Sequence, residues 1–169
     1  MTRLLLVRHG ETDWNHQNRH QGQKDIPMNA LGRDQVNRAV QHLTNEQIDA
    51  AYASDLIRAW ETVKAIAAQH EGLAIIKEPR LREMHFGEWE GLTWTQIRQR
   101  EPSAVDNWSQ ILMEDGPPGG ENLSQFGARV KETTDEIIKA HPDESVLLVA
   151  HGGTLMMLIC RLLEYPIKN

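Results

Sequence analysis

The stretch Leu4-Leu5-Leu6-Val7-Arg8-His9-Gly10 decides the fold of this chain. Its four apolar residues form a short continuous run, which is typical of a strand buried in a parallel sheet. Arg8 and His9 follow at the C-terminal end of this predicted strand, where ligands bind in open α/β sheets. An arginine beside a histidine at that edge indicates an anion site next to a nucleophile or a base.

A second stretch late in the chain repeats this pattern. The apolar run 146–150 ends in His151-Gly152-Gly153, and a helical stretch follows. The free N–H groups and the positive dipole end of such a helix favour a bound anion. In a plainer interpretation, His151 or His9 only caps a strand and bonds a backbone group. The repetition favours the functional interpretation of both histidines.

Residues 49–69 have the same architecture again. Residues 49–53 are expected to form a strand, and apolar residues at helical spacing predict a helix over 56–69. Ser54 and Asp55 are expected to supply its N-cap. Arg58 falls in the first helical turn, where a cation opposes the helix dipole. Arg58 therefore either points at a bound anion or lies on a solvated helix face.

A carboxylate-rich loop over residues 81–91 supplies a candidate acid. Glu83, Glu88 and Glu90 all lie in this loop. A carboxyl group held near a phosphate can act as a general acid. Spacing alone does not choose among the three glutamates, and all of them could be surface charges.

The remaining patterns predict one α/β domain over residues 1–169, with a mainly parallel sheet and helices on both faces, because strands alternate with helices. The predicted strands are 3–8, 49–53, 73–77 and 145–150, and the main predicted helices are 34–43, 56–69, 123–140 and 154–163. Residues 92–120 are expected to form an insertion that covers the active site, with two short helices broken near Pro102. Trp89, Trp94 and Trp108 lie in the middle third of the chain, where they could line a pocket for an apolar or aromatic leaving group, but we expect them to be core anchors.

Composition narrows the function classes. The chain of 169 residues has 18 basic and 24 acidic residues, and its net charge of −6 argues against nucleic-acid binding. One cysteine, Cys160, excludes an intrachain disulfide, and no apolar segment has the length of a membrane span. The sequence contains no zinc, calcium, Walker or dinucleotide motif. We therefore expect a cytoplasmic protein without a metal or cofactor and without a nucleic-acid or membrane partner.

Together these stretches resemble the histidine phosphatase superfamily, also called the phosphoglycerate mutase-like family. The matching stretches follow the family's order across nearly the whole chain: 6–12 with Asn15, Gly22, 25–32, 53–59, 81–91, 119–123 and 149–153. The resemblance implies a three-layer α/β fold. It implies that His9 is the phosphorylated nucleophile, that Glu83 is the proton donor, and that Arg8, Arg58 and His151 bind the phosphoryl group.

The resemblance also assigns four residues to phosphate or substrate binding: Asn15, Gln21, Gly22 and Gly152. The nearby arginine cations should lower the pKa of His9, because a like charge disfavours imidazolium. A neutral His9 keeps a lone pair for attack on phosphorus. Its other ring nitrogen then needs an acceptor, for which a backbone carbonyl is the expected choice.

Within the family, the compact spacing from Glu83 to His151 and the stretch 119–123 are similar to the phosphatase branch. This implies a phosphatase that hydrolyses small-molecule phosphomonoesters through phosphohistidine, with α-ribazole phosphatases and broad-specificity phosphatases as the nearest types. The alternatives are a phosphoglycerate mutase, a metal-independent phosphoserine phosphatase and an inactive phospho-ligand-binding module. Domains of this family usually continue into further strands, so we expect the C-terminal edge strands to be missing after Asn169. The oligomeric state stays open, with a dimer as one outcome.

Overall fold

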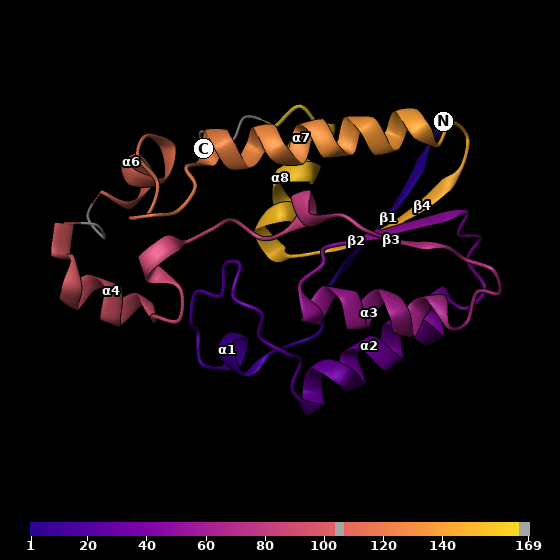
Figure 1. Ribbon diagram of the computed structural model, residues 1–169, viewed down its shortest axis with the longest axis horizontal. Coiled ribbons are helices and arrows are strands. Elements are labelled where there is room, and N and C mark those ends of the chain that lie inside the picture. The colour runs from indigo at the N-terminus through magenta and orange to yellow at the C-terminus, as the bar shows by residue number, and fades with distance from the viewer. Residues whose placement is uncertain (104–106, 166–169) are drawn as a thin grey trace.

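The computed structural model describes residues 1–103 and 107–165, in which helices flank a four-stranded sheet (Figure 1). The strands are β1 (Arg3–Arg8), β2 (Ala50–Ala53), β3 (Ile75–Lys77) and β4 (Ser145–Ala150). Their order is β1-β4-β2-β3, and every pairing is parallel. This confirms the predicted α/β fold and brings the ends of β1 and β4 together.

The helices agree with the predicted pattern, with differences at their ends. They are α1 (Asp13–His16), α2 (Ala30–Leu43), α3 (Ile57–Ala67), α4 (Trp94–Arg100), α6 (Trp108–Met113), α7 (Leu123–Ala140) and α8 (Gly152–Leu162), with 3-10 turns η1 (Pro79–Leu81) and η2 (Gly87–Trp89). Helix α2 begins at Ala30 rather than at the predicted Asp34. Its N-cap is Asn29, whose Oδ1 accepts the Gly32 N–H at 2.8 Å.

The central strand β4 separates two apolar cores. Val146 and Leu148 belong to a core that includes residues of α7 and α8, whereas Leu147 and Val149 belong to a core that includes residues of α3. This alternation follows from the period of two along a strand. Helices α7 and α8 lie on one side of the strands, and α2 and α3 lie on the other (Figure 1). The three layers hold the C-terminal strand ends in place.

The predicted N-cap of α3 is wrong. The residue at the N-cap is Leu56, and neither Ser54 nor Asp55 caps the helix. Asp25 does so from a distant loop, because its Oδ1 accepts the Ile57 N–H at 2.6 Å. The side chain of Asp55 instead pairs with Arg82, and that of Ser54 bonds His151. Two residues with good capping chemistry are thus used in tertiary contacts.

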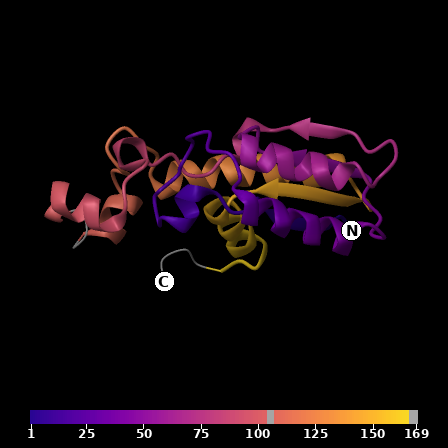
Figure 2. The same cartoon turned by 90° about the horizontal axis from the view of Figure 1, so that it is seen from below.

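Helices α4 and α6 of the expected insertion lie at one end of the molecule (Figure 2). The insertion contributes to a third apolar cluster, which is built around Trp89 and Ile97. Trp89 is buried, and Trp108 stacks on it with the ring centroids 5.2 Å apart. Trp94 packs edge-on against Trp108 but is exposed, so the expectation of a core anchor is wrong for Trp94. Helix α4 ends at Arg100, next to the break predicted near Pro102, but residues 102–103 are helical again, so the segment is not simply two helices; residues 104–106 lie outside the described part, and α6 begins at Trp108. The cover over the active site stays a prediction.

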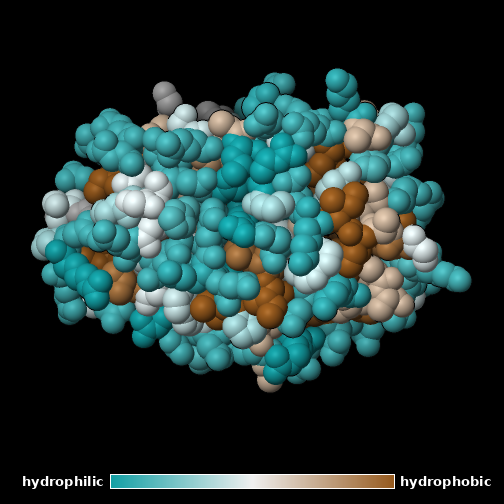
Figure 3. Space-filling view, viewed as in Figure 1, coloured by the Kyte–Doolittle hydropathy of each residue, from teal (hydrophilic) through white to brown (hydrophobic). Residues whose placement is uncertain are grey.

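The surface agrees with the charged composition of the chain. The face seen in Figure 3 is mostly hydrophilic, with separate small apolar patches. In the part of the chain that the structure describes, no helix combines the length and the apolar character needed to cross a membrane. β1 is an edge strand of the described sheet.

Candidate active site

The two histidines that follow β1 and β4 pack against each other. Their ring centroids lie 5.1 Å apart, and both side chains belong to buried residues. The His9 N–H donates to the Ala150 carbonyl at 3.1 Å, which extends the β1–β4 pairing to the site. The parallel register places the two strand–histidine–glycine units side by side, so residues far apart in sequence share one edge.

His9 has one ring nitrogen fixed by its own backbone. Its Nδ1 lies 2.7 Å from the Gly10 carbonyl oxygen. A carbonyl can only accept, so Nδ1 carries the hydrogen and Nε2 keeps a lone pair. Burial lowers the pKa of His9 to about 3, with help from the Arg58 and Arg8 cations and against the bond to Gly10. The sequence predicted the direction of this shift, but burial contributes more than the two arginines.

His151 has the opposite arrangement. Its Nε2 lies 2.8 Å from Oγ of Ser54, and its Nδ1 is buried without a hydrogen-bond partner in the described structure. Burial holds its pKa well below the usual range, and the Arg58 cation acts in the same direction. His151 is therefore neutral near pH 7.

Arg58 is buried at the base of the site and is 1% exposed. The interpretation of this residue as a cation on a solvated helix face is therefore wrong. Its guanidinium donates to the carbonyls of Lys24 at 2.7 Å and Gly22 at 2.8 Å, while Nε has no partner in the described structure. Burial lowers the pKa of Arg58 to about 10, so it stays a cation at neutral pH. Gly22 thus acts through its carbonyl, by fixing this guanidinium.

Arg8 and His9 line a cavity of about 300 Å³. Asn15 also lines it, together with Glu11 and Gln35, which the sequence did not single out. Gly152 lies against Arg8, since a Cβ on Gly152 would be 3.6 Å from the guanidinium carbon. Arg8 and Asn15 can thus hold an anion at this cavity, and the N-terminus of α8 lies next to Arg8.

Asn15 and Gln21 belong to one buried network around Thr12. Thr12 caps α1, and its N–H donates to Oδ1 of Asn15 at 3.1 Å. The Thr12 hydroxyl donates to Oε1 of Gln21 at 2.8 Å. The network orders the loop after His9. The amide oxygens of both residues are engaged there, so any contact with a ligand falls to their NH₂ groups.

The structure distinguishes the three glutamates of the loop. Glu83 turns its carboxylate to the start of α8, where Oε2 accepts the Gly153 N–H at 2.9 Å. The Glu90 carboxylate is buried and holds the loop, accepting the Gln23 N–H at 2.9 Å and the Phe86 N–H at 3.2 Å. Glu88 is exposed. Only Glu83 of the three thus reaches the helix that follows His151.

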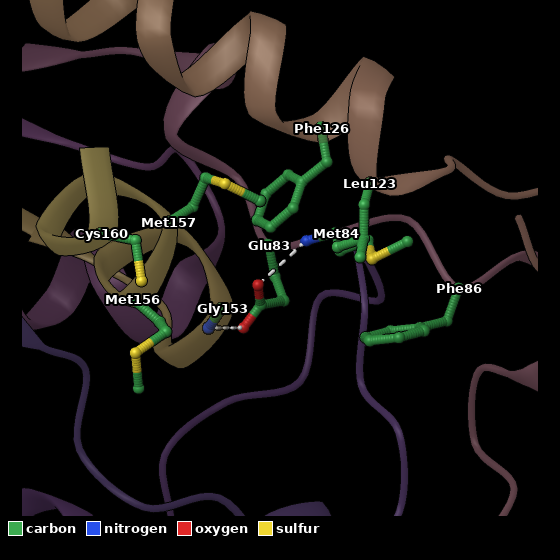
Figure 4. A pocket seen from close by; sticks show the side chains of 9 residues that line it. All are labelled: Glu83, Met84, Phe86, Leu123, Phe126, Gly153, Met156, Met157 and Cys160. Carbon is green, nitrogen blue, oxygen red and sulfur yellow. Dashed lines mark hydrogen bonds between the residues drawn. The ribbon is translucent and has the colours of Figure 1, made fainter. Parts of the chain in front are cut away.

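A second cavity of about 260 Å³ opens beside Glu83 (Figure 4). Its lining is otherwise apolar apart from Gly153: Met84, Phe86, Leu123, Phe126, Met156, Met157 and Cys160. Gly153 lines this second cavity, and its neighbour Gly152 lies near Arg8, which lines the first. The Glu83 carboxylate therefore borders an apolar cavity at the helix whose first residue lies near Arg8.

The sequence did not predict that Arg129 contacts the loop that carries Glu83. Its guanidinium donates to the carbonyls of Arg80 at 2.7 Å, Arg82 at 2.9 Å and Glu83 at 3.3 Å. It also pairs with Glu121, whose Oε2 accepts the His85 N–H at 2.9 Å. This clamp fixes the backbone on which Glu83 sits. An arginine on an amphipathic helix gives no sequence signal for such a role.

The site holds side chains suited to a phosphate and no evident metal cage. Within residues 1–103 and 107–165, no three His, Cys, Asp or Glu side chains are placed to hold a metal ion. Arg8 and Arg58 offer the fixed donor forks that phosphate oxygens accept bidentately.

Comparison with known proteins agrees with this geometry. A family model described as histidine phosphatase superfamily (branch 1) matches residues 4–169. A glucosyl-3-phosphoglycerate phosphatase of Mycobacterium tuberculosis is 37% identical over 175 residues, covering 99% of this chain and 78% of that protein.

Two solved structures have the same fold. The structure of Bacillus stearothermophilus YhfR has a TM-score of 0.91 and 36% identity, covering 99% of this chain and 83% of the other. The α-ribazole phosphatase from Shigella flexneri has a TM-score of 0.89 and 29% identity, covering 97% of this chain and 81% of the other. The chain is a phosphoric monoester hydrolase and belongs to branch 1 of the histidine phosphatase superfamily.

Proposed function

We propose that the chain hydrolyses small-molecule phosphomonoesters through a phosphohistidine formed on His9. The observation that carries this is the state of His9 itself. Its Nδ1 is held by the Gly10 carbonyl, and burial with two nearby arginines keeps the ring neutral. Nε2 therefore has a free lone pair beside two cations, which is what attack on a phosphate needs.

In the first step, Arg8, Arg58 and His151 bind the phosphoryl oxygens. A phosphomonoester carries about two negative charges at neutral pH, so charge-assisted hydrogen bonds dominate its binding. Nε2 of His9 forms a bond to phosphorus as the bond from phosphorus to the leaving oxygen breaks. Glu83, in its protonated form, gives its proton to that oxygen, and the alcohol departs.

In the second step, water reverses the roles. The Glu83 carboxylate takes a proton from a water molecule, whose oxygen attacks phosphorus while the bond to Nε2 breaks. Inorganic phosphate leaves, His9 regains its lone pair and Glu83 is protonated again. The arginines stabilise the charge that spreads over the phosphoryl oxygens in both steps. Asn15, Gln21, Gly22 and Gly152 support this pocket through the loop network, the carbonyl on Arg58 and the contact with Arg8.

The cavity beside Glu83 indicates the leaving group. Glu83 is the residue that must reach the departing oxygen, so the rest of the alcohol lies in the cavity that its carboxylate borders. Six of the other lining residues are Met, Phe or Leu, and none is a cation. A substrate carboxylate in this cavity would lack a cationic partner. We infer that aryl and alkyl phosphates are better substrates than 3-phosphoglycerate.

Several methionines in the lining also favour breadth. Met side chains are flexible and polarisable, so Met84, Met156 and Met157 can adapt to apolar groups of different shape. This supports an activity of the broad-specificity or α-ribazole phosphatase type. Phe86 lines the cavity and also packs in the apolar cluster around Trp89, to which the segment 92–120 contributes. We therefore also propose that the segment 92–120 borders this site.

Trapping the intermediate tests the mechanism. The protein is mixed with p-nitrophenyl phosphate in excess EDTA and quenched within one turnover, and the phosphorylated peptide is mapped by mass spectrometry at alkaline pH. We expect an acid-labile, alkali-stable phosphate on the peptide containing His9. Turnover without a phosphoprotein, or a phosphate on another residue, would contradict the proposal.

A charge placed in the cavity tests the leaving-group assignment. Met156→Lys adds a cation at the cavity, and Ile159→Lys adds one on the same helix at an exposed residue outside the lining. We expect Met156→Lys to raise kcat/KM for 3-phosphoglycerate relative to phenyl phosphate by about tenfold, the worth of one charge-assisted bond. Ile159→Lys should leave the ratio unchanged, and equal effects of the two variants would contradict the assignment.

The alternatives give different results in the same assays. A mutase would transfer phosphate between the hydroxyls of phosphoglycerate faster than it releases inorganic phosphate. A metal-independent phosphoserine phosphatase would prefer phosphoserine over aryl phosphates. An inactive binding module would bind phosphate esters without turnover or phosphohistidine.

A further inference from the structure

The hydroxyl of Ser54 is buried against His151. Ser54 follows β2 at the same sheet edge at which His9 and His151 follow their strands. Both Ser54 and His151 are 0% exposed, and the Ser54 N–H donates to the Val149 carbonyl at 3.1 Å. Its side chain therefore has a fixed backbone beneath it, and water does not reach it.

Counting hydrogens assigns the direction of the bond between these residues. Oγ of Ser54 accepts the Leu56 N–H at 3.3 Å and lies 2.8 Å from Nε2 of His151. Its one hydrogen needs an acceptor, and in the described structure Nε2 is the acceptor within reach. If Nε2 carried the hydrogen instead, the Ser54 hydrogen and the Nδ1 lone pair would both be buried without a partner, whereas a donating hydroxyl leaves only the Nδ1–H unpartnered in the described structure. The hydroxyl thus donates to Nε2.

The other nitrogen of His151 then carries the ring hydrogen. Burial and the Arg58 cation keep this imidazole neutral, so only one nitrogen is protonated. Because Nε2 accepts from Ser54, that nitrogen is Nδ1. Nδ1 is buried and has no partner in the described structure, and its ring packs beside His9. A phosphoryl group on His9 would supply the missing acceptor.

We propose that Ser54 is a positioning residue that fixes the tautomer of His151, so that a neutral imidazole donates its Nδ1–H to the transferring phosphoryl group. The proposal rests on the phosphohistidine mechanism at the same site. In the other tautomer, a lone pair on Nδ1 would face the phosphoryl oxygens and repel them. The wrong tautomer of a catalytic histidine is costly elsewhere, as loss of the orienting aspartate shows in serine proteases.

Nuclear magnetic resonance reads the tautomer directly and without substrate. In protein labelled with ¹⁵N-histidine, two-bond correlations from the ring hydrogens separate the protonated nitrogen from the unprotonated one. The His151 signals are assigned by their loss in His151→Gln. We expect a protonated Nδ1 and an unprotonated Nε2 in the wild type at pH 7. A protonated Nε2 would overturn the proposal, whether or not any variant folds.

Removing the hydroxyl gives the kinetic test. We expect Ser54→Ala to lower kcat for p-nitrophenyl phosphate by about 10–100-fold, the range seen when the group that orients a histidine is removed. KM should change less, because the Nδ1–H bond strengthens as charge develops on the phosphoryl oxygens. Inhibition by orthovanadate should weaken in parallel with kcat. Ser54→Thr keeps the hydroxyl and should restore most of kcat.

A matched control separates this role from loss of a buried hydroxyl in general. Thr134→Val removes the hydroxyl of a buried residue in α7 that donates to the Val130 carbonyl at 2.7 Å. It should leave kcat and the His151 spectrum unchanged. A folded Ser54→Ala protein with wild-type kcat and an unchanged His151 tautomer would overturn the proposal. Failure of the phosphohistidine mechanism would show instead as a wild-type protein without a phosphoenzyme and with the predicted His151 tautomer.

Discussion

The units Arg8-His9-Gly10 and Ala150-His151-Gly152 look alike in sequence, but the fold uses them in opposite ways. Each histidine ends a core strand, is buried and is kept neutral. His9 uses Nδ1 on its own neighbour and leaves Nε2 as an acceptor, whereas His151 has Nε2 bonded to Ser54 and leaves Nδ1 without a partner in the described structure. One neutral imidazole is suited to attack phosphorus and the other to stabilise its oxygens.

The two glycines differ as well. A Cβ on Gly10 would lie 2.3 Å from the Gly32 carbonyl oxygen, so the backbones of this loop and α2 meet closely. A Cβ on Gly152 would lie 3.6 Å from Arg8, its nearest neighbour outside the helix. Packing therefore requires glycine in the first unit but not in the second.

The largest expected effect is the loss of kcat when His9 of the first unit is replaced. His9→Ala should lower kcat by about 10⁴-fold or more, because loss of a nucleophile removes the covalent route. Phosphate release from p-nitrophenyl phosphate in excess EDTA measures this. His42→Ala, at an exposed position on α2, is the matched control and should retain wild-type turnover. Substantial turnover by folded His9→Ala protein would exclude His9 as the nucleophile.

Replacing His151 of the second unit should lower kcat less than replacing His9. His151→Ala removes one donor to the phosphoryl group, which is worth about 10²–10³-fold in kcat. The phosphoenzyme should still form on His9, more slowly, and rapid-quench measurement of its build-up checks this. If His151→Ala lowered kcat as much as His9→Ala and formed no phosphoenzyme, the proposed separate roles of the two histidines would be wrong.

The two units should also differ in how much an alanine at their glycine changes the free energy of unfolding. Gly10→Ala should lower the free energy of unfolding by about 2–3 kcal/mol through overpacking and should displace the carbonyl that holds His9. Gly152→Ala should change it by less than about 1 kcal/mol, because alanine suits a helix better than glycine and its Cβ makes ordinary contacts. Urea unfolding of both variants tests this, and equal destabilisation would contradict it.

The smallest effect is a pH dependence of stability that the two histidines share. The pKa of His9 is about 3 in the folded protein and about 6.5 when unfolded, so the unfolded chain binds the extra proton between these values. Its contribution to stability is complete above pH 6.5 and is lost as pH falls toward 3.

Between pH 7.5 and 5.5, His9 should account for a loss of about 1.4 kcal/mol in the free energy of unfolding, and His151 acts in the same direction. Urea unfolding at both pH values measures the loss. The His9→Gln variant should be less sensitive to pH over this range. A variant as sensitive as the wild type would show that His9 titrates normally in the folded protein.

Much of the fold follows from local sequence patterns. β1, β4 and α7 have the predicted bounds, because apolar runs and helical spacing act within a few residues. The N-cap of α3 was predicted wrongly because a distant carboxylate, Asp25, competes for the same N–H group. Local propensity does not register a partner that comes from another part of the chain.

The candidate site, too, was predicted from the sequence only in part. The residues proposed for the chemistry, Arg8, His9, Arg58, Glu83 and His151, were all named from the sequence through its resemblance to the family. Residues alone left three glutamates open, and the structure separates them because Glu83 meets α8 while Glu90 is buried under the loop. The bond from Arg129 to the Arg80 carbonyl, next to the carboxylate-rich loop, joins residues almost fifty positions apart, so no local motif predicts it.

Local sequence accounts for two core strands that are followed by histidine and glycine, and for the lone pair of His9, because the Gly10 carbonyl that holds its Nδ1 belongs to the next residue. That His151 is suited to donate rather than accept follows from the packing of the folded chain alone. Its partner Ser54 lies 97 positions away and reaches it through the pairing of β2 with β4. A proton's place on a ring follows from whatever acceptor or donor packing brings beside it, and packing is not local.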